Sequence, residues 1–295
     1  MVVYRMMETI ELIRGAAWVV NPLMSKEECY KIIQLCNDAG IQNTPGRGDK
    51  RHRNNFNHKF VDGGLSSKLW DRLRSMVPSE YSISEEPCAE NDDKDKDATP
   101  SRKIPPGFSA ESAQRMTGTW VPYGVNTHFS ALLYKSGGHF GPHRDSHVHF
   151  GQHEQSILTV AIYLNDRLED GGGATHFLRD DMEIPDVDST NRLRAPASSI
   201  VASVKADLAG KAVIFHHDLL HEGGTLSETA EPKWLLVTQV LYRRDPMTAP
   251  QLSSDQLLAR QLMDQAEKAE TEGKIPEAIH LYNRAFRLDP TLDGV

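Results

Sequence analysis

The pattern of apolar and polar positions predicts a series of strands in the second half of the chain, with helical segments on both sides. Short apolar runs, most of them separated by Gly, Pro, Asn or Asp, are typical of β-strands. Eight such runs cover residues 117–123, 129–134, 140–145, 157–164, 174–178, 200–204, 212–215 and 234–242. They predict a mainly β fold, an antiparallel sandwich or barrel with helices packed outside it.

The first predicted helix follows a short strand at residues 16–20. Ser25 and Glu28 have the spacing of a capping box, and apolar residues then recur at helical spacing until Gly40. These apolar residues are Cys29, Ile32, Ile33 and Cys36. We therefore interpret Cys29 and Cys36 as core residues of a helix.

A second amphipathic helix is predicted after Ser66. It contains Leu69, Leu73 and Met76 and ends before Pro78. The polar and basic residues 46–59, which lie between the two helices, predict a loop that is either a solvated connection or a flap facing a substrate.

Charge is distributed unevenly along the chain. The formal net charge is -8, and residues 85–97 contain seven acids against two lysines. The surrounding residues 82–112 have the composition of a disordered insertion. This balance disfavours nucleic acid as a partner, although residues 47–53 are basic. Overall, 39% apolar and 25% charged residues are typical of a globular protein.

Two helical stripes follow residue 250. A capping-box pattern at Ser253 and Gln256 begins the first, and Gly273 separates the two. The pair resembles one tetratricopeptide unit, which needs a surface to pack on. We therefore divide the chain into a catalytic domain, residues 1–245, and a helical hairpin, residues 250–295. The hairpin either docks on its own catalytic domain or binds a protein partner.

Targeting features are not evident in the sequence. Charged residues interrupt the first twenty positions, so they do not resemble a signal peptide, and no segment has the roughly 20 apolar residues of a membrane span. Cys29, Cys36 and Cys88 lack the spacing of a metal site or redox pair. We expect a soluble cytoplasmic or nuclear protein that does not interact with membranes.

Candidate chemistry begins with a His-x-Asp triplet in the predicted strand 140–145. Side chains alternate along a strand, so His143 and Asp145 should share one face while Arg144 points away. A third imidazole from another strand would complete a two-histidine, one-carboxylate triad, which suits a non-haem iron(II) oxygenase. His221, which is 76 residues after Asp145, is our candidate.

A second His-x-Asp triplet, His216 and Asp218, is a rival. Its third ligand would be His221, which is too near in sequence to come from another strand, or His280 in the helical tail. Neither choice is geometrically attractive, so we favour the first triplet. Lys233 begins the apolar run WLLVTQVLY, where its ammonium group could project into a barrel and bind a distal carboxylate.

The order and residues of several segments resemble the prolyl 4-hydroxylase-like branch of the Fe(II)/2-oxoglutarate-dependent dioxygenases. The segments are YGVNTHFSALLYKSGGHFGPHRD, LTVAIYLND, GGGATHF, AVIFHHDLLHEGG and PKWLLVTQVLYRR. The resemblance covers about residues 16–244. It implies a double-stranded β-helix core of the jelly-roll or cupin type, with iron held by His143, Asp145 and His221.

The resemblance also assigns the co-substrate pocket. Lys233 would pair with the C5 carboxylate of 2-oxoglutarate, Tyr134 would contact the same carboxylate, and Tyr163 and Thr175 would lie nearby. The implied reaction consumes O2 and 2-oxoglutarate, hydroxylates a substrate C–H and releases succinate and CO2, with ascorbate as a candidate reductant. Asp145 disfavours a halogenase, because halogenating relatives carry a small residue there.

A peptidyl side chain, proline first, is the substrate that this resemblance favours. The alternatives are a small metabolite and nucleic-acid demethylation, or a non-catalytic scaffold that acts through the helical tail. The segment Arg53, Asn54 and Asn55 matches the flexible loop of the family. Asn57 stands where many relatives have arginine, and two additional residues separate His221 from Lys233, which predicts a longer turn at residues 227–231.

Overall fold

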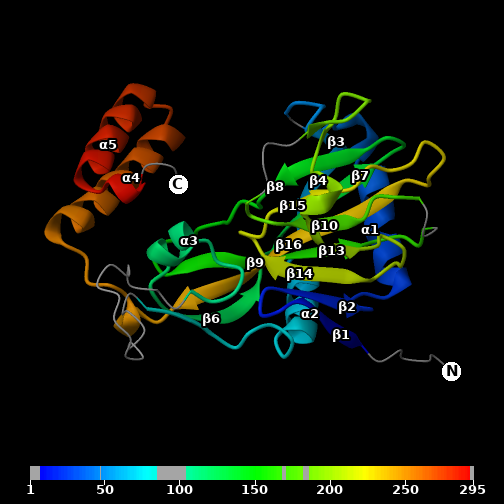
Figure 1. The fold of residues 1–295 in the computed structure, drawn as a ribbon. Coiled ribbons are helices and arrows are strands. Elements are labelled where there is room, and N and C mark those ends of the chain that lie inside the picture. The colour runs from blue at the N-terminus through cyan, green and yellow to red at the C-terminus, as the bar shows by residue number, and fades with distance from the viewer. Residues whose placement is uncertain (1–6, 47, 85–103, 168–170, 182–185, 293–295) are drawn as a thin grey trace.

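The computed structural model describes residues 7–46, 48–84, 104–167, 171–181 and 186–292, and within them two antiparallel sheets pack against each other (Figure 1). The larger sheet has the order β1 (Glu8–Ile13), β2 (Ala17–Asn21), β14 (Ala212–His216), β9 (Glu154–Tyr163), β16 (Lys233–Arg244), β6 (Gly118–Val125) and β5 (Tyr81–Ile83). Two further strands extend this sheet, because β7 (His128–Tyr134) pairs with β16 and with β4 (Phe56–Val61).

The smaller sheet contains His143, the first residue of the first predicted triplet, and His221. Its order is β13 (Ile200–Val204), β10 (Thr175–Leu178), β15 (His221–Gly223), β8 (His139–His143) and β3 (Arg53–Asn54). A separate two-stranded ribbon consists of β11 (Asp186–Val187) and β12 (Leu193–Arg194). Each of the eight predicted apolar runs contains a strand, which confirms the mainly β prediction.

Residue alternation in the larger sheet separates the core from the interior between the sheets. On β9, Val160 and Ile162 belong to the core under the helices, whereas Thr159 and Ala161 line a cavity on the other face. The residues of β16 also alternate between the core under the helices and the lining of the cavity. Since successive side chains of a strand point to opposite faces, each strand contributes to the core and to the cavity at once.

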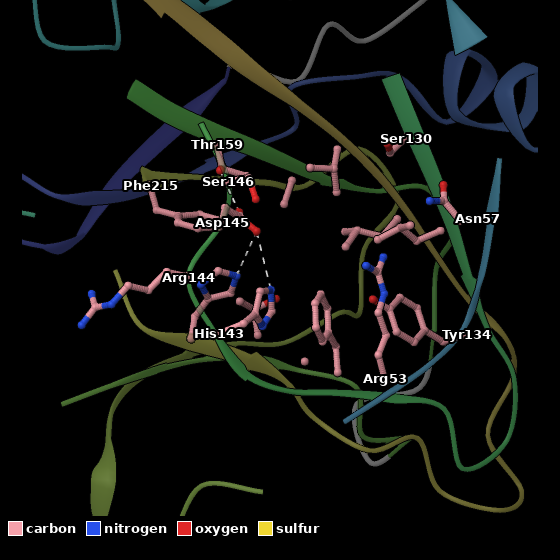
Figure 2. A pocket seen from close by; sticks show the side chains of 18 of the residues that line it. Arg53, Asn57, Ser130, Tyr134, His143, Arg144, Asp145, Ser146, Thr159 and Phe215 are labelled. Carbon is pink, nitrogen blue, oxygen red and sulfur yellow. Dashed lines mark hydrogen bonds and ion pairs between the residues drawn. The ribbon is translucent and has the colours of Figure 1, made fainter. Parts of the chain in front are cut away.

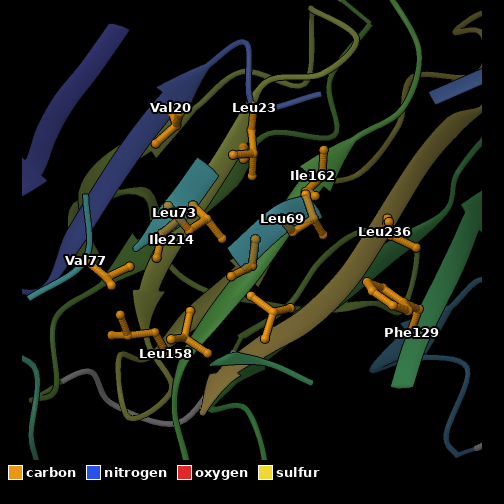
Figure 3. Close-up of a cluster of buried hydrophobic side chains, with 14 of the residues drawn as sticks. Val20, Leu23, Leu69, Leu73, Val77, Phe129, Leu158, Ile162, Ile214 and Leu236 are labelled. Carbon is orange, nitrogen blue, oxygen red and sulfur yellow. The ribbon is translucent and has the colours of Figure 1, made fainter. Parts of the chain in front are cut away.

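Two helices cover the outer face of the larger sheet. α1 (Lys26–Asp38) begins with the predicted capping box of Ser25 and Glu28, and α2 (Gly63–Leu73) begins at Asp62, whose side chain accepts a bond from the Leu65 amide. Figure 3 shows side chains of α2 and of the sheet interdigitating, with Leu69 and Leu73 among them. Cys29 and Cys36 are buried in the same core, so their predicted packing role is confirmed.

Three boundaries differ from the predictions. α2 begins before Ser66, because Asp62 is the better cap, and it ends at Leu73, so Met76 lies beyond it. The basic stretch 46–59 is not a continuous loop, since β3 and the first four residues of β4 lie within it and pair with β8 and β7. The predicted strand 140–145 is shorter than expected and ends at His143.

Most of the predicted acidic insertion, residues 85–103, lies outside the described residues. The two ends of the predicted range have regular structure, which contradicts the prediction there. Residues 82 and 83 belong to β5, which pairs with β6, and residues 110–112 begin α3 (Ala110–Arg115), capped by Ser109. Burial of apolar side chains explains why these two ends have regular structure, because Ile83 and Ala113 pack in the core under the helices.

The C-terminal segment forms two helices, α4 (Ser254–Thr271) and α5 (Ile275–Leu288), which lie to one side of the sheets in Figure 1. Ala259 and Leu262 of α4 pack with Ala285 of α5 in a cluster of their own. Its likeness to a tetratricopeptide unit and its part in partner binding stay predictions. None of the helices in the described residues is long and apolar enough to cross a membrane.

Candidate metal and co-substrate site

Three predicted ligand residues meet at the edge of the cavity between the sheets. His143 ends β8 and His221 begins β15, and these two residues are direct partners in the antiparallel pairing of the strands. One carboxylate oxygen of Asp145, Oδ1, lies 3.6 Å from His143 Nε2 and 3.8 Å from His221 Nε2. Figure 2 shows the His143 imidazole close to the Asp145 carboxylate.

Both imidazoles are held in the tautomer that suits a metal. His143 Nδ1 lies 2.8 Å from the Gly141 carbonyl oxygen, and His221 Nδ1 lies 2.9 Å from that of Leu219. A carbonyl oxygen only accepts, so each Nδ1 carries the proton and donates it, and each Nε2 keeps its lone pair. Burial also lowers the pKa of His221 to about 4, which keeps its imidazole neutral.

The Asp145 carboxylate is oriented by two bonds outside the triad. Its Oδ2 accepts a 2.8 Å bond from the Thr159 hydroxyl, and its backbone N–H donates to the His217 carbonyl oxygen at 3.0 Å. Burial would raise its pKa, but the imidazoles of His221 and His143 and the Thr159 bond together hold it well below its usual range. Asp145 is therefore ionised, although it follows β8 rather than lying in it.

The donor set fits an iron(II) ion. Two imidazole nitrogens and one carboxylate oxygen are the ligands of the two-histidine, one-carboxylate facial triad, which leaves open positions. Ligand bonds of about 2.1 Å place adjacent donor atoms roughly 3 Å apart, so closing from 3.6 and 3.8 Å needs a movement of less than about 1 Å. The open side of the triad faces the cavity, whose volume is about 290 Å³.

Aromatic side chains fix the imidazole rings. Phe140 stacks on His143 with ring centroids 3.5 Å apart, and Phe215 meets His221 edge-on at 4.7 Å. Arg144 points away from the triad, as predicted, with its guanidinium on the Asp218 carbonyl oxygen and the Asp180 carboxylate (Figure 2). The ligands are thus packed before any ion binds.

Lys233 lines the same cavity and is 2% exposed. Its ammonium donates a 2.7 Å bond to the Gly173 carbonyl oxygen and lies 4.9 Å from the centre of the Tyr134 ring. Burial, with the nearby charge of Arg167, lowers its pKa to about 7. Among the described residues, no carboxylate forms an ion pair with Lys233, so a buried cation faces the cavity without a counter-charge.

The other predicted pocket residues separate into two groups. Tyr134 and Thr175 line the cavity, whereas Tyr163 lies behind it and shares a 2.7 Å hydrogen bond with the Thr175 hydroxyl. Burial raises the pKa of Tyr134 to about 12, so its phenol keeps the proton and can donate it to a ligand oxygen. Tyr163 is better placed to orient Thr175 than to touch a cavity ligand.

Several residues at the site were missed by the sequence analysis. Thr159 interrupts the apolar run of β9 on its cavity face, a signal that could have found it. Phe140 carries the Arg53 guanidinium 4.3 Å above its ring, beside the stacked His143. Arg167 donates to the carbonyl oxygens of Gly171, Gly172, Ala206 and Glu231, so it ties together the loops that flank Lys233. No local pattern predicts that network.

The rival triplet lies in a different cluster. His216 and Asp218 approach each other and His217, whereas His221 belongs with His143 and Asp145. His280 lies on α5, outside both clusters. A turn precedes β16, since the Ala230 amide donates to the Ser227 carbonyl oxygen, and Lys233 lies in the cavity after it.

Comparison with known proteins finds a match over the strands that form this site. Residues 129–239 match the family model of the 2OG-Fe(II) oxygenase superfamily, which is less than half of the chain. No curated protein sequence matches the chain.

Similar solved structures include two prolyl hydroxylases captured with a ligand. One is a viral collagen prolyl hydroxylase from Paramecium Bursaria Chlorella virus-1 in complex with 2OG, with 14% identity, a TM-score of 0.40 and coverage of 78% of this chain and 97% of that chain. Another is a Trichoplax adhaerens prolyl hydroxylase with a hypoxia inducible factor peptide, with 12% identity, a TM-score of 0.45 and coverage of 77% and 84%.

A third structure is a Pseudomonas putida prolyl-4-hydroxylase, with 10% identity, a TM-score of 0.43 and coverage of 79% of this chain and 94% of that chain.

Proposed function

We propose that the chain is an iron(II)- and 2-oxoglutarate-dependent dioxygenase with a double-stranded β-helix core. The observation that carries the proposal is the pairing of two features in one cavity. His143, Asp145 and His221 present an open metal-binding face, and Lys233 is a buried cation that forms no ion pair with a carboxylate of the described residues. A dicarboxylate with a metal-chelating end and a free carboxylate satisfies both.

Each residue has a defined part in this reaction. Bound iron with 2-oxoglutarate and O2 supplies an oxidation that converts 2-oxoglutarate to succinate and CO2 and hydroxylates a C–H bond. His143, Asp145 and His221 hold the ion, and Thr159 orients the carboxylate ligand. Lys233 binds the C5 carboxylate of 2-oxoglutarate through a charge-assisted hydrogen bond, and the Tyr134 hydroxyl donates a second bond to it.

The residues around the bound co-substrate exclude water. Phe140 and Phe215 pack against the imidazoles, and Leu132, Ala161, Leu235 and Val237 are apolar members of the cavity lining. Tyr163 holds the Thr175 hydroxyl in place from behind. An apolar wall around a few fixed polar groups orients a small ligand and strengthens its charged contacts.

For the substrate we propose a peptidyl side chain, proline first. Among the described residues that line the cavity, Asp145 is the only acid, while Arg53 and Lys59 add positive charge near Asn57. The Asn57 amide oxygen, Oδ1, is buried without a hydrogen-bond partner. A backbone N–H of a peptide would satisfy this acceptor, and acidic residues beside the target would complement Arg53 and Lys59.

Succinate formation tests the proposal directly. Purified, iron-loaded protein is incubated in air with 2-oxoglutarate and either a proline-containing acidic peptide set or a cell lysate, with and without ascorbate. The matched variants are Asp145→Ala, which removes a ligand, and Asp166→Ala, which removes an exposed carboxylate paired with Lys26 outside the cavity. We expect turnover in the parent protein and in Asp166→Ala, and none in Asp145→Ala.

Mass spectrometry of the peptides then locates the gain of one oxygen atom. Oxygen on a small molecule of the lysate, with none on peptide, would replace the peptide substrate by a metabolite and keep the oxygenase. Absence of both succinate formation and 2-oxoglutarate binding in the iron-loaded parent protein would reject the oxygenase and favour a scaffold.

A further inference from the structure

A second group of buried ligand-type side chains lies behind the triad, at the end of β14. His216, His217 and Asp218 each place one nitrogen or oxygen atom within 4.8 Å of the others, and all three residues are buried. The group is separate from the triad, although the His217 carbonyl oxygen accepts the Asp145 N–H. The proposed oxygenase reaction does not use these side chains.

His217 and Asp218 are oriented as metal ligands usually are. His217 Nδ1 lies 2.8 Å from the Ile157 carbonyl oxygen, so the proton is on Nδ1 and Nε2 keeps its lone pair. Asp218 Oδ2 accepts 3.0 Å bonds from the Ser109 amide and hydroxyl, and the carboxylate also has a hydrogen bond with the Ser112 side chain. In metal sites, hydrogen bonds typically hold the ligand atoms that face away from the ion, as His217 Nδ1 and Asp218 Oδ2 are held here.

The two atoms that would face the ion, Asp218 Oδ1 and His217 Nε2, are separated by a distance that suits two ligands of one metal ion. Asp218 Oδ1 lies 3.4 Å from His217 Nε2. Two ligands at about 2.0–2.1 Å from a tetrahedral ion lie roughly 3.3 Å apart. The separation of these two atoms therefore matches that of two ligands of one ion.

Unpartnered nitrogen atoms point to a missing ligand. His216 Nε2 and His217 Nε2 are both buried without a hydrogen-bond partner, and His216 and His217 are 0% and 2% exposed. Such atoms are rare in folded proteins, and each is costly to bury. Two of them in adjacent residues beside a carboxylate indicate a group that all three side chains would share.

The charge of the cluster favours a cation. In the described part of the chain, the only ion-pair partner of the Asp218 carboxylate is His217, whose Nδ1 donates its proton to the Ile157 carbonyl oxygen and whose Nε2 keeps its lone pair. The aromatic ring of Phe108 lies 3.9 Å from that of His216, which keeps the surroundings dry. The charge of Arg115 opposes a cation here, and three ligands would have to outweigh it.

We infer that His216, His217 and Asp218 form a second metal site, which takes a divalent ion of the zinc class. Two imidazoles and a carboxylate are ligands that zinc accepts, and they are also few enough to leave a position for water. His216 Nδ1 currently accepts a 3.2 Å bond from the Asp218 amide. Coordination through Nε2 places the proton on Nδ1, so this long bond is the contact that metal binding gives up.

The site would stabilise the segment that carries the triad. The Asp145 N–H donates to the His217 carbonyl oxygen, and the Arg144 guanidinium donates to that of Asp218. An ion that fixes His217 and Asp218 thereby fixes the two residues after β8. This role is structural and does not depend on the proposed oxygenase reaction.

Zinc stoichiometry tests the inference in a background without the triad. The full chain carrying His143→Ala and Asp145→Ala is freed of metal with a chelator, loaded with Zn²⁺, dialysed and analysed for bound metal. We expect one equivalent per chain and a rise in the unfolding temperature on loading. Adding Asp218→Asn or His217→Gln to this background should reduce the bound zinc at least tenfold and abolish the rise.

His149→Gln is the matched control, because His149 is a neighbouring imidazole outside the three-residue group. The His149→Gln variant should still bind one equivalent of zinc per chain. Asp218→Asn is close to isosteric, so the fold should survive if His217→Gln does not fold. No zinc in the background protein, as expected if a water molecule bridges the three side chains, would overturn the inference. One equivalent of bound zinc in both the Asp218→Asn and the His217→Gln variants would overturn the inference as well.

Discussion

Replacing Lys233 by methionine should stabilise the protein while removing its affinity for 2-oxoglutarate. Lys233 is 2% exposed, and burial lowers the pKa of its ammonium group from 10.5 to about 7. At 1.36 kcal/mol per pH unit, the difference corresponds to about 5 kcal/mol of unfavourable free energy. Methionine fills a similar volume, and it leaves the Gly173 carbonyl oxygen without its donor, a loss of about 1–3 kcal/mol. The expected net gain in unfolding free energy is about 2–4 kcal/mol at pH 7.

The sign of the pH dependence provides a second check. Between pH 7 and 10.5 the unfolded chain holds a proton on Lys233 that the folded chain has released, so the unfolding free energy of the parent protein rises with pH in this window. Below pH 7 both states are protonated and the full penalty remains, whereas at pH 7 about half of the folded chains have released the proton. The stability advantage of Lys233→Met should therefore be largest below pH 7 and shrink toward pH 10.5.

Urea unfolding in the absence of 2-oxoglutarate, at several pH values, measures this difference, and calorimetric titration measures the binding. Lys211→Met is the matched control. Lys211 is also buried but is ion-paired with Asp207, so its removal leaves a buried carboxylate unpaired and should destabilise. A Lys233→Met protein that is less stable than the parent at pH 7, or whose advantage does not change with pH, would refute the reasoning.

Three further predictions follow from the site and the core. Thr159→Val removes the bond to Asp145 and should weaken metal binding by roughly tenfold, as measured by Co²⁺ titration; an unchanged affinity would contradict the orienting role. Binding of 2-oxoglutarate requires protonated Lys233, so its Kd should rise up to about tenfold per pH unit above pH 7 in calorimetric titrations. A pH-independent Kd would exclude Lys233 from the co-substrate contact. Leu69→Ala should lower the unfolding free energy by about 2–5 kcal/mol and leave kcat/KM of the folded protein unchanged, because Leu69 lies in the core under α2; a selective loss of activity would argue otherwise.

The parts of the fold predicted from sequence are those in which one local pattern determines the structure. Ser25 and Glu28 predicted the start of α1, because the capping box is satisfied within four residues. β4 was missed in part, since basic and polar residues conceal the alternation of Phe56, His58 and Phe60. β15 has three residues, too few for any periodicity, and it is recognised only through its pairing with β8 and β10.

In the candidate site, too, local patterns predicted some features, whereas contacts between distant segments could not be predicted. Spacing and strand alternation indicated that His143 and Asp145 face the same way, although Asp145 lies past the strand end. Thr159 could have been noticed as a polar residue within the apolar run of β9, but its contact with Asp145 could not be predicted, because Thr159 and Phe215 both reach the triad from the opposite sheet. The same holds for His217, whose carbonyl oxygen receives the Asp145 N–H across 72 residues of sequence.

The position of Lys233 depends on strand register rather than on the length of the preceding loop. Pairing between β16 and β9 is regular from Leu235 opposite Tyr163 to Val240 opposite Leu158, and the irregularity comes only after Val240. A shift by one residue within β16 would turn Lys233 toward the core under the helices and Trp234 toward the cavity. The turn at residues 227–231 lies before the strand and leaves this register unchanged. Additional residues are therefore tolerated between His221 and Lys233, whereas a single insertion between Lys233 and Gln239 should abolish 2-oxoglutarate binding.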